Sequence, residues 1–169
     1  MLYNKGDKMK LYIKQKLISL NASFDVFDEN NNVKYNVEGK LISIGHKFTI
    51  YKNGKEVAYI AQEILNLLPR FNVFMNNKKV ASIQKKLSLL SPIYEIKGLN
   101  WDIKGDITSH EYSIYEGRKE IATVSKKWLK ITDTYEINIE DEKNEIMALA
   151  VVLAIDAVFS MRRSANSNN

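Results

Sequence analysis

The stretch NEIMALAVVLAIDAVFSMRR, residues 144–163, decides the fold of this chain. Every residue from Ile146 to Ile155 is apolar, and apolar residues resume at Ala157 after a single aspartate, Asp156. A helix that is apolar on all sides is buried on all sides. The stretch therefore predicts a helix over residues 144–161 that other elements of the fold surround.

The alternative for this stretch is a membrane anchor at the C-terminus. A bilayer-spanning helix needs about 20 apolar residues, and this run is interrupted at Asp156. Acidic residues precede the run and Arg162 and Arg163 follow it, which suits the helix dipole. Small side chains keep the helix narrow enough for the lumen of a barrel, namely Ala148, Ala150, Ala154 and Ala157. A buried core helix is the preferred interpretation.

The residues before the helix contain four copies of one hairpin pattern. Each copy reads aromatic, any residue, Ile or Val, aromatic, then a polar turn, then a second run with apolar residues at alternate positions. The copies are FDVFDENNNVKYNV from Phe24, FTIYKNGKEVAYI from Phe48, FNVFMNNKKVASI from Phe71 and YSIYEGRKEIATV from Tyr112. Alternating β-branched and aromatic residues are typical of strands.

Three of the copies have a two-residue turn that tolerates positive φ, as type I′ and II′ hairpins require. The turn centres are Asn53-Gly54, Asn76-Asn77 and Gly117-Arg118. The resulting apolar cross-strand pairs are expected to be Ile50 with Val57, Val73 with Val80, and Ile114 with Ile121. The links AQEILNLLPR, QKKLSLLSPI and SKKWLKITDT are expected to be further short strands with bends, and YEIKGLNWDIKGDI another hairpin.

About a dozen short strands in a chain of 169 residues predict an all-β fold. The expected architecture is a roughly twelve-stranded antiparallel closed β-barrel that encloses the hydrophobic C-terminal helix. The expected organisation is an N-terminal extension at 1–8, a single barrel domain at 9–163 and a disordered tail at 164–169.

The composition excludes several kinds of site. The chain has no cysteine, which excludes disulfides, thiolate catalysis and cysteine-ligated metal centres. The formal net charge is +5, which favours acidic partners such as anionic lipid, nucleic acid or an acidic protein. Because the N-terminus lacks the apolar core of a signal peptide, the expected location is cytoplasmic, with peripheral contact to a membrane left open.

Five segments carry a resemblance to a known family: MKLYIKQK (9–16), YNVEGKLISIGHKFTIY (35–51), NWDIKGD (100–106), SKKWLKITDTYEINI (125–139) and LAVVLAID (149–156). In order and spacing they resemble the LURP-one-related proteins of the tubby C-terminal-like superfamily. The resemblance implies a twelve-stranded barrel around a central hydrophobic helix, in agreement with the interpretation from the residues. It implies no biochemical activity for this family, although the similar tubby domains bind phosphoinositide heads and phospholipid scramblases act at membranes.

The sequence contains no motif for catalysis, a cofactor or a metal. A G-x-S-x-G elbow, a P-loop and a G-x-G-x-x-G fingerprint are all missing from it. The two histidines, His46 and His110, have no second ligand at metal spacing, and both are expected to be solvated turn residues. The chain is therefore expected not to be an enzyme and to use no cofactor.

Asp156 is the most unusual position, because it interrupts an apolar helix that is expected to be buried. A buried carboxylate must find hydrogen-bond donors or a cation. One interpretation is that it meets backbone N–H groups or a lysine near one mouth of the barrel and fixes the register of the helix. The other is a perturbed acid or base in a pocket.

Lysines are the remaining candidates for an anionic-ligand site. They are Lys85 and Lys86, Lys126 and Lys127 at equivalent places in two repeats, and Lys40 and Lys47 beside another strand. Because neighbouring strand residues point to opposite faces, one lysine of each adjacent pair is expected to face solvent. Grouped lysines attract anionic headgroups, although protection of sheet edges explains them equally well.

The expected function is a non-catalytic binding module for an anionic lipid headgroup or another acidic ligand. The alternatives are a scaffolding protein that binds another protein, and an enzyme with an unrecognised pocket near Asp156. Nucleic acid is the weaker option, because no helix carries a basic stripe and the aromatic residues follow strand periodicity. The sequence does not give the oligomeric state.

Overall fold

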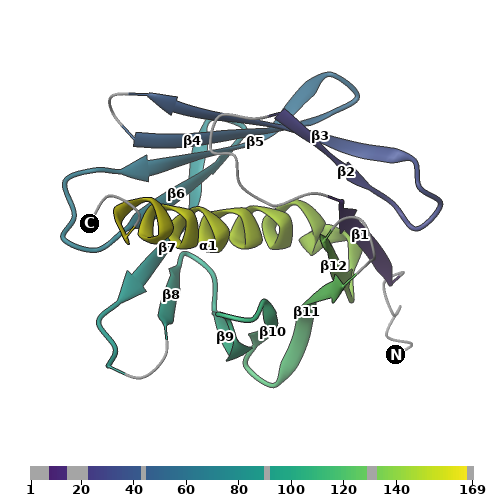
Figure 1. The fold of residues 1–169 in the computed structure, drawn as a ribbon. Helices are drawn as coiled ribbons and strands as arrows, with labels where there is room; N and C mark the ends of the chain where they lie inside the picture. The colour runs from purple at the N-terminus through teal and green to yellow at the C-terminus, as the bar shows by residue number, and fades with distance from the viewer. Residues whose placement is uncertain (1–7, 15–22, 43–44, 90–91, 129–132, 167–169) are drawn as a thin grey trace.

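The strands come first along the chain and the helix last (Figure 1). The computed structural model describes residues 8–14, 23–42, 45–89, 92–128 and 133–166. The strands are β1 (Met9–Ile13), β2 (Ser23–Phe27), β3 (Val33–Ile42), β4 (Gly45–Lys52), β5 (Lys55–Glu63), β6 (Arg70–Met75), β7 (Lys78–Lys86), β8 (Ile93–Lys97), β9 (Trp101–Asp106), β10 (Glu111–Glu116), β11 (Lys119–Trp128) and β12 (Asp133–Ile139). A short 3-10 helix, η1 (Glu142–Asn144), leads into α1 (Glu145–Asn166).

All twelve strands belong to one antiparallel sheet in the order β8-β7-β6-β5-β4-β3-β2-β1-β12-β11-β10-β9. Most neighbours in the sheet are also neighbours in sequence, but β12 returns beside β1 and so brings the two halves of the chain together. β8 and β9 are the two ends of the sheet, and no ladder joins them within the described ranges. The barrel is therefore nearly closed rather than closed. The prediction of a hairpin in YEIKGLNWDIKGDI is wrong, because its two strands, β8 and β9, do not pair.

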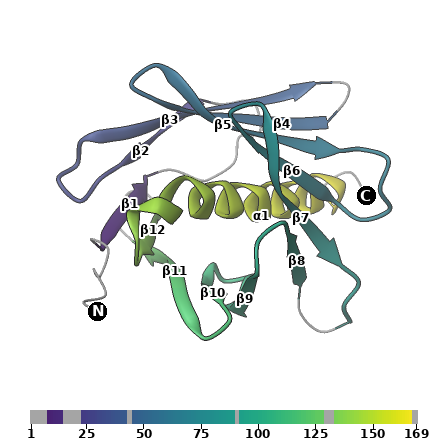
Figure 2. The ribbon, with the colours of Figure 1, turned by 180° about the vertical axis from the view of Figure 1, so that it is seen from behind.

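The helix α1 runs between strands on both sides in two opposite views (Figures 1 and 2). Every residue from 147 to 158 is buried, which matches the apolar stretch that the sequence presents. The helix ends at Asn166, so residues 164–166, expected in a disordered tail, belong to it. Within the described ranges, no helix is both long enough and apolar enough to cross a bilayer.

The predicted two-residue turns are confirmed by the pairs that close them, Lys52 with Lys55, Met75 with Lys78, and Glu116 with Lys119. Asn53 and Gly54 have φ angles of 52° and 75°. Both central residues are therefore in the left-handed region, as a type I′ hairpin requires. The third turn has positive φ at Gly117, where glycine meets no steric penalty.

Each of these hairpins also contains a β-bulge, which the sequence analysis did not predict. Ile50 pairs with Ala58, Val73 with Ala81, and Ile114 with Ala122. The predicted partners were wrong by one residue, because a bulge places two residues of one strand opposite one residue of the other. The fourth copy of the pattern has the same shift, after Val26. A bulge increases the local twist, so every hairpin contributes to the curl of the sheet.

Candidate functional site

One end of the barrel holds the C-terminal half of α1 and the connection β1–β2, together with five further strand connections. Because neighbouring strands are antiparallel, the connections β3–β4, β5–β6, β7–β8, β9–β10 and β11–β12 all fall at this end. We call it the C-terminal rim and define it by the described residues within 38–47, 61–71, 84–95, 104–112 and 125–135. The opposite rim holds the turns at 53–54, 76–77 and 117–118 and the start of α1.

The six lysines nominated from the sequence all lie in the C-terminal rim: Lys40, Lys47, Lys85, Lys86, Lys126 and Lys127. Lys40 and Lys47 are direct partners across β3 and β4. The Lys40 side chain is 72% exposed and its ammonium lies 3.8 Å from Glu38. The ammonium of Lys47 lies over the ring of Tyr59. Two facing lysines concentrate positive charge at this point of the rim.

Lys126 and Lys127 lie close to the end of strand β11 and point to opposite faces of the wall. Lys126 shares the strand parity of the buried Val124, and its ammonium lies 5.9 Å from the centre of the Tyr135 ring. Lys127 is exposed. One lysine of the pair therefore faces solvent, as expected, and the other lies at the mouth of the barrel.

Lys85 and Lys86 repeat this arrangement at the end of β7. Lys85 shares the parity of the buried Ile83 and lies opposite Tyr94 in the ladder with β8. Lys86 is on the outer face, where its ammonium is 2.7 Å from Glu95. An exposed ion pair of this kind contributes less than about 1 kcal/mol, so an anionic ligand can compete for Lys86.

Asp156 lies beneath the same rim and is 4% exposed. Its Oδ1 atom is 3.0 Å from Nε2 of His110, a residue 46 positions away in the chain. The His110 ring also packs against the rings of Tyr135 and Phe159, with centroids 5.0 and 5.5 Å away. His110 lies in a turn, as expected, but the prediction that it is solvated is wrong, because its side chain is only 17% exposed and pairs with a residue of the helix.

A tight turn between β9 and β10 places His110. The Asp106 carboxylate accepts hydrogen bonds from Ser109, through Oγ at 2.6 Å and the backbone N–H at 3.1 Å, and from the Thr108 hydroxyl. These hydrogen bonds, with that of the Ser109 side chain largest, lower the pKa of Asp106 to about 2. His110 follows with a φ of 58°, a conformation that few side chains adopt outside such turns.

The Asp156–His110 pair fastens the helix to the wall. Neither of the two described pockets is lined by Asp156 or by His110. Tyr112 lies buried nearby, and burial first and the charge of Asp156 second raise the pKa of its phenol well above 10. A carboxylate and an imidazole can exchange a proton, but this pair is packed among aromatic rings. The pair joins the helix to the turn between β9 and β10.

His46, the other histidine, lies in β4 and is 7% exposed. Its Nδ1 atom has no hydrogen-bond partner within the described ranges. Burial in these surroundings lowers the pKa of the imidazole, because the charged form loses hydration. The expectation of a solvated turn residue is therefore wrong for His46 as well.

The rim also carries exposed aliphatic residues that the sequence analysis missed. The links after β5 and β7 were expected to be strands, but β5 ends at Glu63 and β7 at Lys86. Among the described residues seven large hydrophobic side chains are exposed, and six lie in or beside these two links: Ile64, Leu65, Leu67, Leu87, Leu89 and Ile93. A signal was present, because ILNLL and LSLL do not alternate with polar residues and occur at the same place in two repeats.

A shallow pocket of about 320 Å³ lies on the outer wall over β6, β7 and β8. The side chains of Arg70, Lys79, Ser82 and Lys97 are among those that line it. Arg70 is held by Gln84 at 2.9 Å and more loosely by Glu63 at 3.5 Å. Three cations around a hydroxyl suit a phosphate-sized anion, and the sequence analysis singled out none of them.

The comparisons with known proteins agree with this fold. The family model of the LURP-one-related proteins matches residues 9–156, and with them nearly the whole barrel and the helix as far as Asp156. The chain belongs to the LURP-one-related family.

A protein of Bacillus subtilis strain 168 is similar to this chain in sequence. This protein, YxjI, is described as uncharacterised and is 32% identical over 151 residues, which cover 89% of the LURP-one-related chain and 93% of YxjI. An X-ray structure of a protein from Arabidopsis thaliana has a TM-score of 0.59 at 16% identity and covers 89% of this chain and 92% of that one. That likeness shows a shared fold, and the resemblance inferred from the five sequence segments is confirmed at the level of the family.

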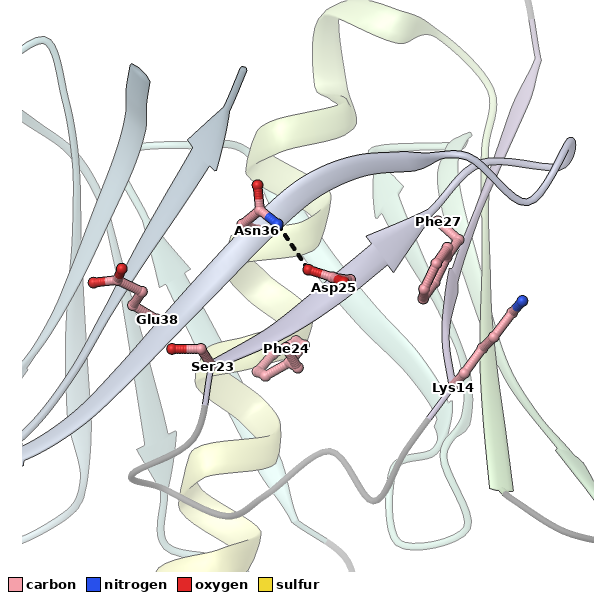
Figure 3. A pocket seen from close by; sticks show the side chains of 7 residues that line it. All are labelled: Lys14, Ser23, Phe24, Asp25, Phe27, Asn36 and Glu38. Carbon is pink, nitrogen blue, oxygen red and sulfur yellow. Dashed lines mark hydrogen bonds between the residues drawn. The ribbon is translucent and has the colours of Figure 1, made fainter. Parts of the chain in front are cut away.

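A second pocket of the LURP-one-related chain, of about 560 Å³, lies beside β2 (Figure 3). Its lining includes the carboxylates of Asp25 and Glu38, and Asp25 accepts a hydrogen bond from Asn36 at 2.7 Å. The ammonium of Lys14 lies over the Phe27 ring at 4.5 Å. Two carboxylates beside one lysine do not favour an anion, so this pocket is not part of the candidate site.

Proposed function

We propose that this protein is a non-catalytic binding module that holds an anionic, phosphate-bearing ligand at the C-terminal rim. The observation that carries the proposal is that three separate strand pairs contribute six lysines to the same end of the barrel. Lysine is a point charge with three donors, which suits the phosphate oxygens of a headgroup.

The packing of the interior supports a site on the outside. The helix residues 147–158 are all buried, and strands lie on both sides of them (Figures 1 and 2). We infer that the barrel encloses α1 as a plug, in the manner of the tubby C-terminal-like domains. An occupied lumen leaves the rim and the outer wall as the surfaces for a ligand. The proposal includes a cytoplasmic protein that reaches its ligand at the inner face of a membrane.

Three of the six lysines are exposed or ion-paired only at the surface: Lys40, Lys86 and Lys127. Each lysine near an anionic surface contributes about 1 kcal/mol. Removal of all three is therefore expected to weaken binding roughly a hundredfold at low salt.

The test is co-sedimentation with vesicles of phosphatidylcholine, with and without phosphatidylserine, at low and at physiological salt. We expect the protein to sediment with the anionic vesicles and to be released by salt. The variant Lys40→Ala/Lys86→Ala/Lys127→Ala is expected to remain in the supernatant. The matched control, Lys55→Ala/Lys78→Ala/Lys119→Ala, removes the same charge from exposed positions on the opposite rim.

Equal sedimentation with neutral and anionic vesicles contradicts the proposal, and so does an equal loss of binding in the two triple variants. A further variant, Lys79→Ala/Lys97→Ala, asks whether the anion sits in the wall pocket instead. If that variant alone abolishes binding, the ligand site is the wall and the assignment to the C-terminal rim is wrong.

A further inference from the structure

The six exposed aliphatic residues lie in or beside two links that are neighbours in the sheet, and these links make up one region of the C-terminal rim. We call it the aliphatic patch: Ile64, Leu65, Leu67, Leu87, Leu89 and Ile93. The links that carry it are neighbours because β6 and β7 pair directly. The backbone N–H of Lys85 also donates to the carbonyl of Pro69 at 3.0 Å, which ties the end of one link to the beginning of the other.

The exposure of the patch is unusual. The four leucines have exposed fractions between 86% and 105%, and the two isoleucines are 51% exposed. Singly scattered apolar residues on a surface need no explanation, whereas a contiguous group marks a contact with a partner or a membrane. The rest of the described surface has only Val33 in this class, on the opposite rim.

We propose that the aliphatic patch inserts into the interface of a lipid bilayer that contains anionic lipids. The inference rests on the proposed function, since the lysines of the same rim would bind the headgroups while the leucines enter the boundary with the acyl chains. Membrane-surface elements combine these two contributions, buried apolar area and attraction to anionic lipid.

The chemistry of the patch favours a bilayer over a protein partner. Energetically important centres of protein interfaces are rich in tryptophan, tyrosine and arginine, and leucine is under-represented there. The aliphatic patch has no aromatic member. Its leucines stand almost fully exposed, as separate projecting side chains, and a fluid acyl phase accommodates them without a shaped groove.

Basic residues flank the aliphatic patch, where they would lie at the level of the headgroups when the leucines are inserted. Lys85 and Lys86 directly precede Leu87, and Arg70 directly follows the link that carries Leu65 and Leu67. Long basic side chains extend toward headgroups while their stems lie along apolar surface. Lys86 pairs with Glu95 and Arg70 with Glu63 at the surface, and lipid phosphates can replace such weak pairs.

The test uses the absence of cysteine from the chain, which allows one label at a chosen position. Leu67→Cys and Leu89→Cys are labelled with an environment-sensitive fluorophore, and Val33→Cys on the opposite rim is the matched control. With phosphatidylserine-containing vesicles we expect a blue shift at positions 67 and 89 and none at position 33. Quenchers attached to the lipid acyl chains are expected to quench the first two labels and spare the third.

A second variant removes the apolar side chains without removing charge. Leu65→Ser/Leu67→Ser/Leu87→Ser/Leu89→Ser is expected to lower the vesicle partition coefficient about tenfold or more, because each leucine loses its transfer from water. Its circular dichroism spectrum and melting temperature should match the parent, since these side chains are exposed in the folded chain.

The outcomes separate the two proposals. If the protein binds anionic vesicles but the labels at 67 and 89 do not respond, insertion is wrong and headgroup binding by lysines stands. If it binds no vesicle, both are wrong. If the unliganded protein dimerises and the leucine-to-serine variant is a monomer, the patch is covered by a second copy of the chain and the bilayer assignment is overturned.

Discussion

Oδ1 of Asp156 in the helix lies 3.0 Å from Nε2 of His110 in the turn between β9 and β10. Asp156 is the only charged residue between Ile146 and Phe159, and it meets a residue whose place is set by the Asp106 turn. The contact fixes the helix against one strand connection at the C-terminal rim. Without this contact, a helix with no other charged side chain over this length could slide or rotate within its apolar surroundings.

Replacing Asp156 is expected to destabilise the fold. Asp156→Ala leaves His110 without this partner and opens a gap among buried side chains, and the expected loss is about 2 to 3 kcal/mol of unfolding free energy. Urea denaturation measures it. Asp102→Ala, at an exposed carboxylate, serves as control and is expected to change stability by less than about 0.5 kcal/mol. An unchanged urea midpoint for Asp156→Ala would show that the pair does not hold the helix.

The start of the helix has its own polar anchor. The Tyr35 hydroxyl donates to Glu145 Oε2 at 2.9 Å, and the Lys34 ammonium lies 2.7 Å from Oε1. Burial, reinforced by the charge of Glu145, raises the pKa of Tyr35 far above its usual value, so the phenol remains a donor. Tyr35→Phe is expected to cost about 1 to 2 kcal/mol, measured by urea denaturation.

Tyr51→Phe is the matched control for Tyr35→Phe, because the Tyr51 hydroxyl has no hydrogen bond to another residue of the described ranges. We expect it to leave the urea midpoint nearly unchanged. If both phenylalanine variants lose the same stability, the loss comes from ring packing in the wall and the anchor at Glu145 contributes nothing.

Buried His46 makes the stability dependent on pH. Burial lowers its folded-state pKa below the unfolded value of about 6.5, so the unfolded chain binds more protons in acid. This contribution to stability is fully present above pH 6.5 and is lost as the pH falls. His46→Gln has no group that titrates here, and its urea midpoint should depend less steeply on pH below 6.5. Equal slopes for the variant and the parent would remove His46 as the cause.

Alanine variants at two glycines with positive φ allow the cost of backbone strain to be measured apart from the cost of a steric clash. Gly98 has a φ of 90° and lies against the wall, where an added Cβ would come within 2.5 Å of the Val80 carbonyl oxygen. Gly54 has a φ of 75° in an open turn, where a Cβ would meet nothing within 4 Å. Gly54→Ala is expected to cost about 1 kcal/mol and Gly98→Ala about 3 kcal/mol or more. Thermal unfolding measures both, and equal losses would contradict the clash at Gly98.

The repeated pattern made much of the fold predictable from sequence. The turns at Asn53-Gly54 and Asn76-Asn77 need residues that tolerate positive φ, and strand alternation then assigns the inward side chains. The apolar run before Asp156 predicts a buried helix, because a helix on the surface would need a polar face and this run has none. The bulges could not be predicted. In the first hairpin the extra residue is Val57, which is apolar like the strand residues that face the core, so it does not stand out in the alternation.

The candidate site was predictable only in part. Four of the six lysines could be found because they recur in equivalent places of two repeats, and antiparallel alternation brings all six to one rim. The partner of Asp156 could not be found, since the turn at His110 gives no indication of which distant residue it faces. The segments that carry the leucines after Glu63 and Lys86 were predicted to be strands, because an apolar run alone does not show whether other residues pack against it.

The hairpins that begin at Phe48, Phe71 and Tyr112 share one length, a two-residue turn and a bulge after the same strand position. Such segments are interchangeable parts. A chimera that carries the first in place of the second would keep apolar side chains at the same inward positions, because neither parity nor register changes. The barrel is in this sense assembled from a standard unit, and under the proposed function the differences that matter for binding lie in the links between the units.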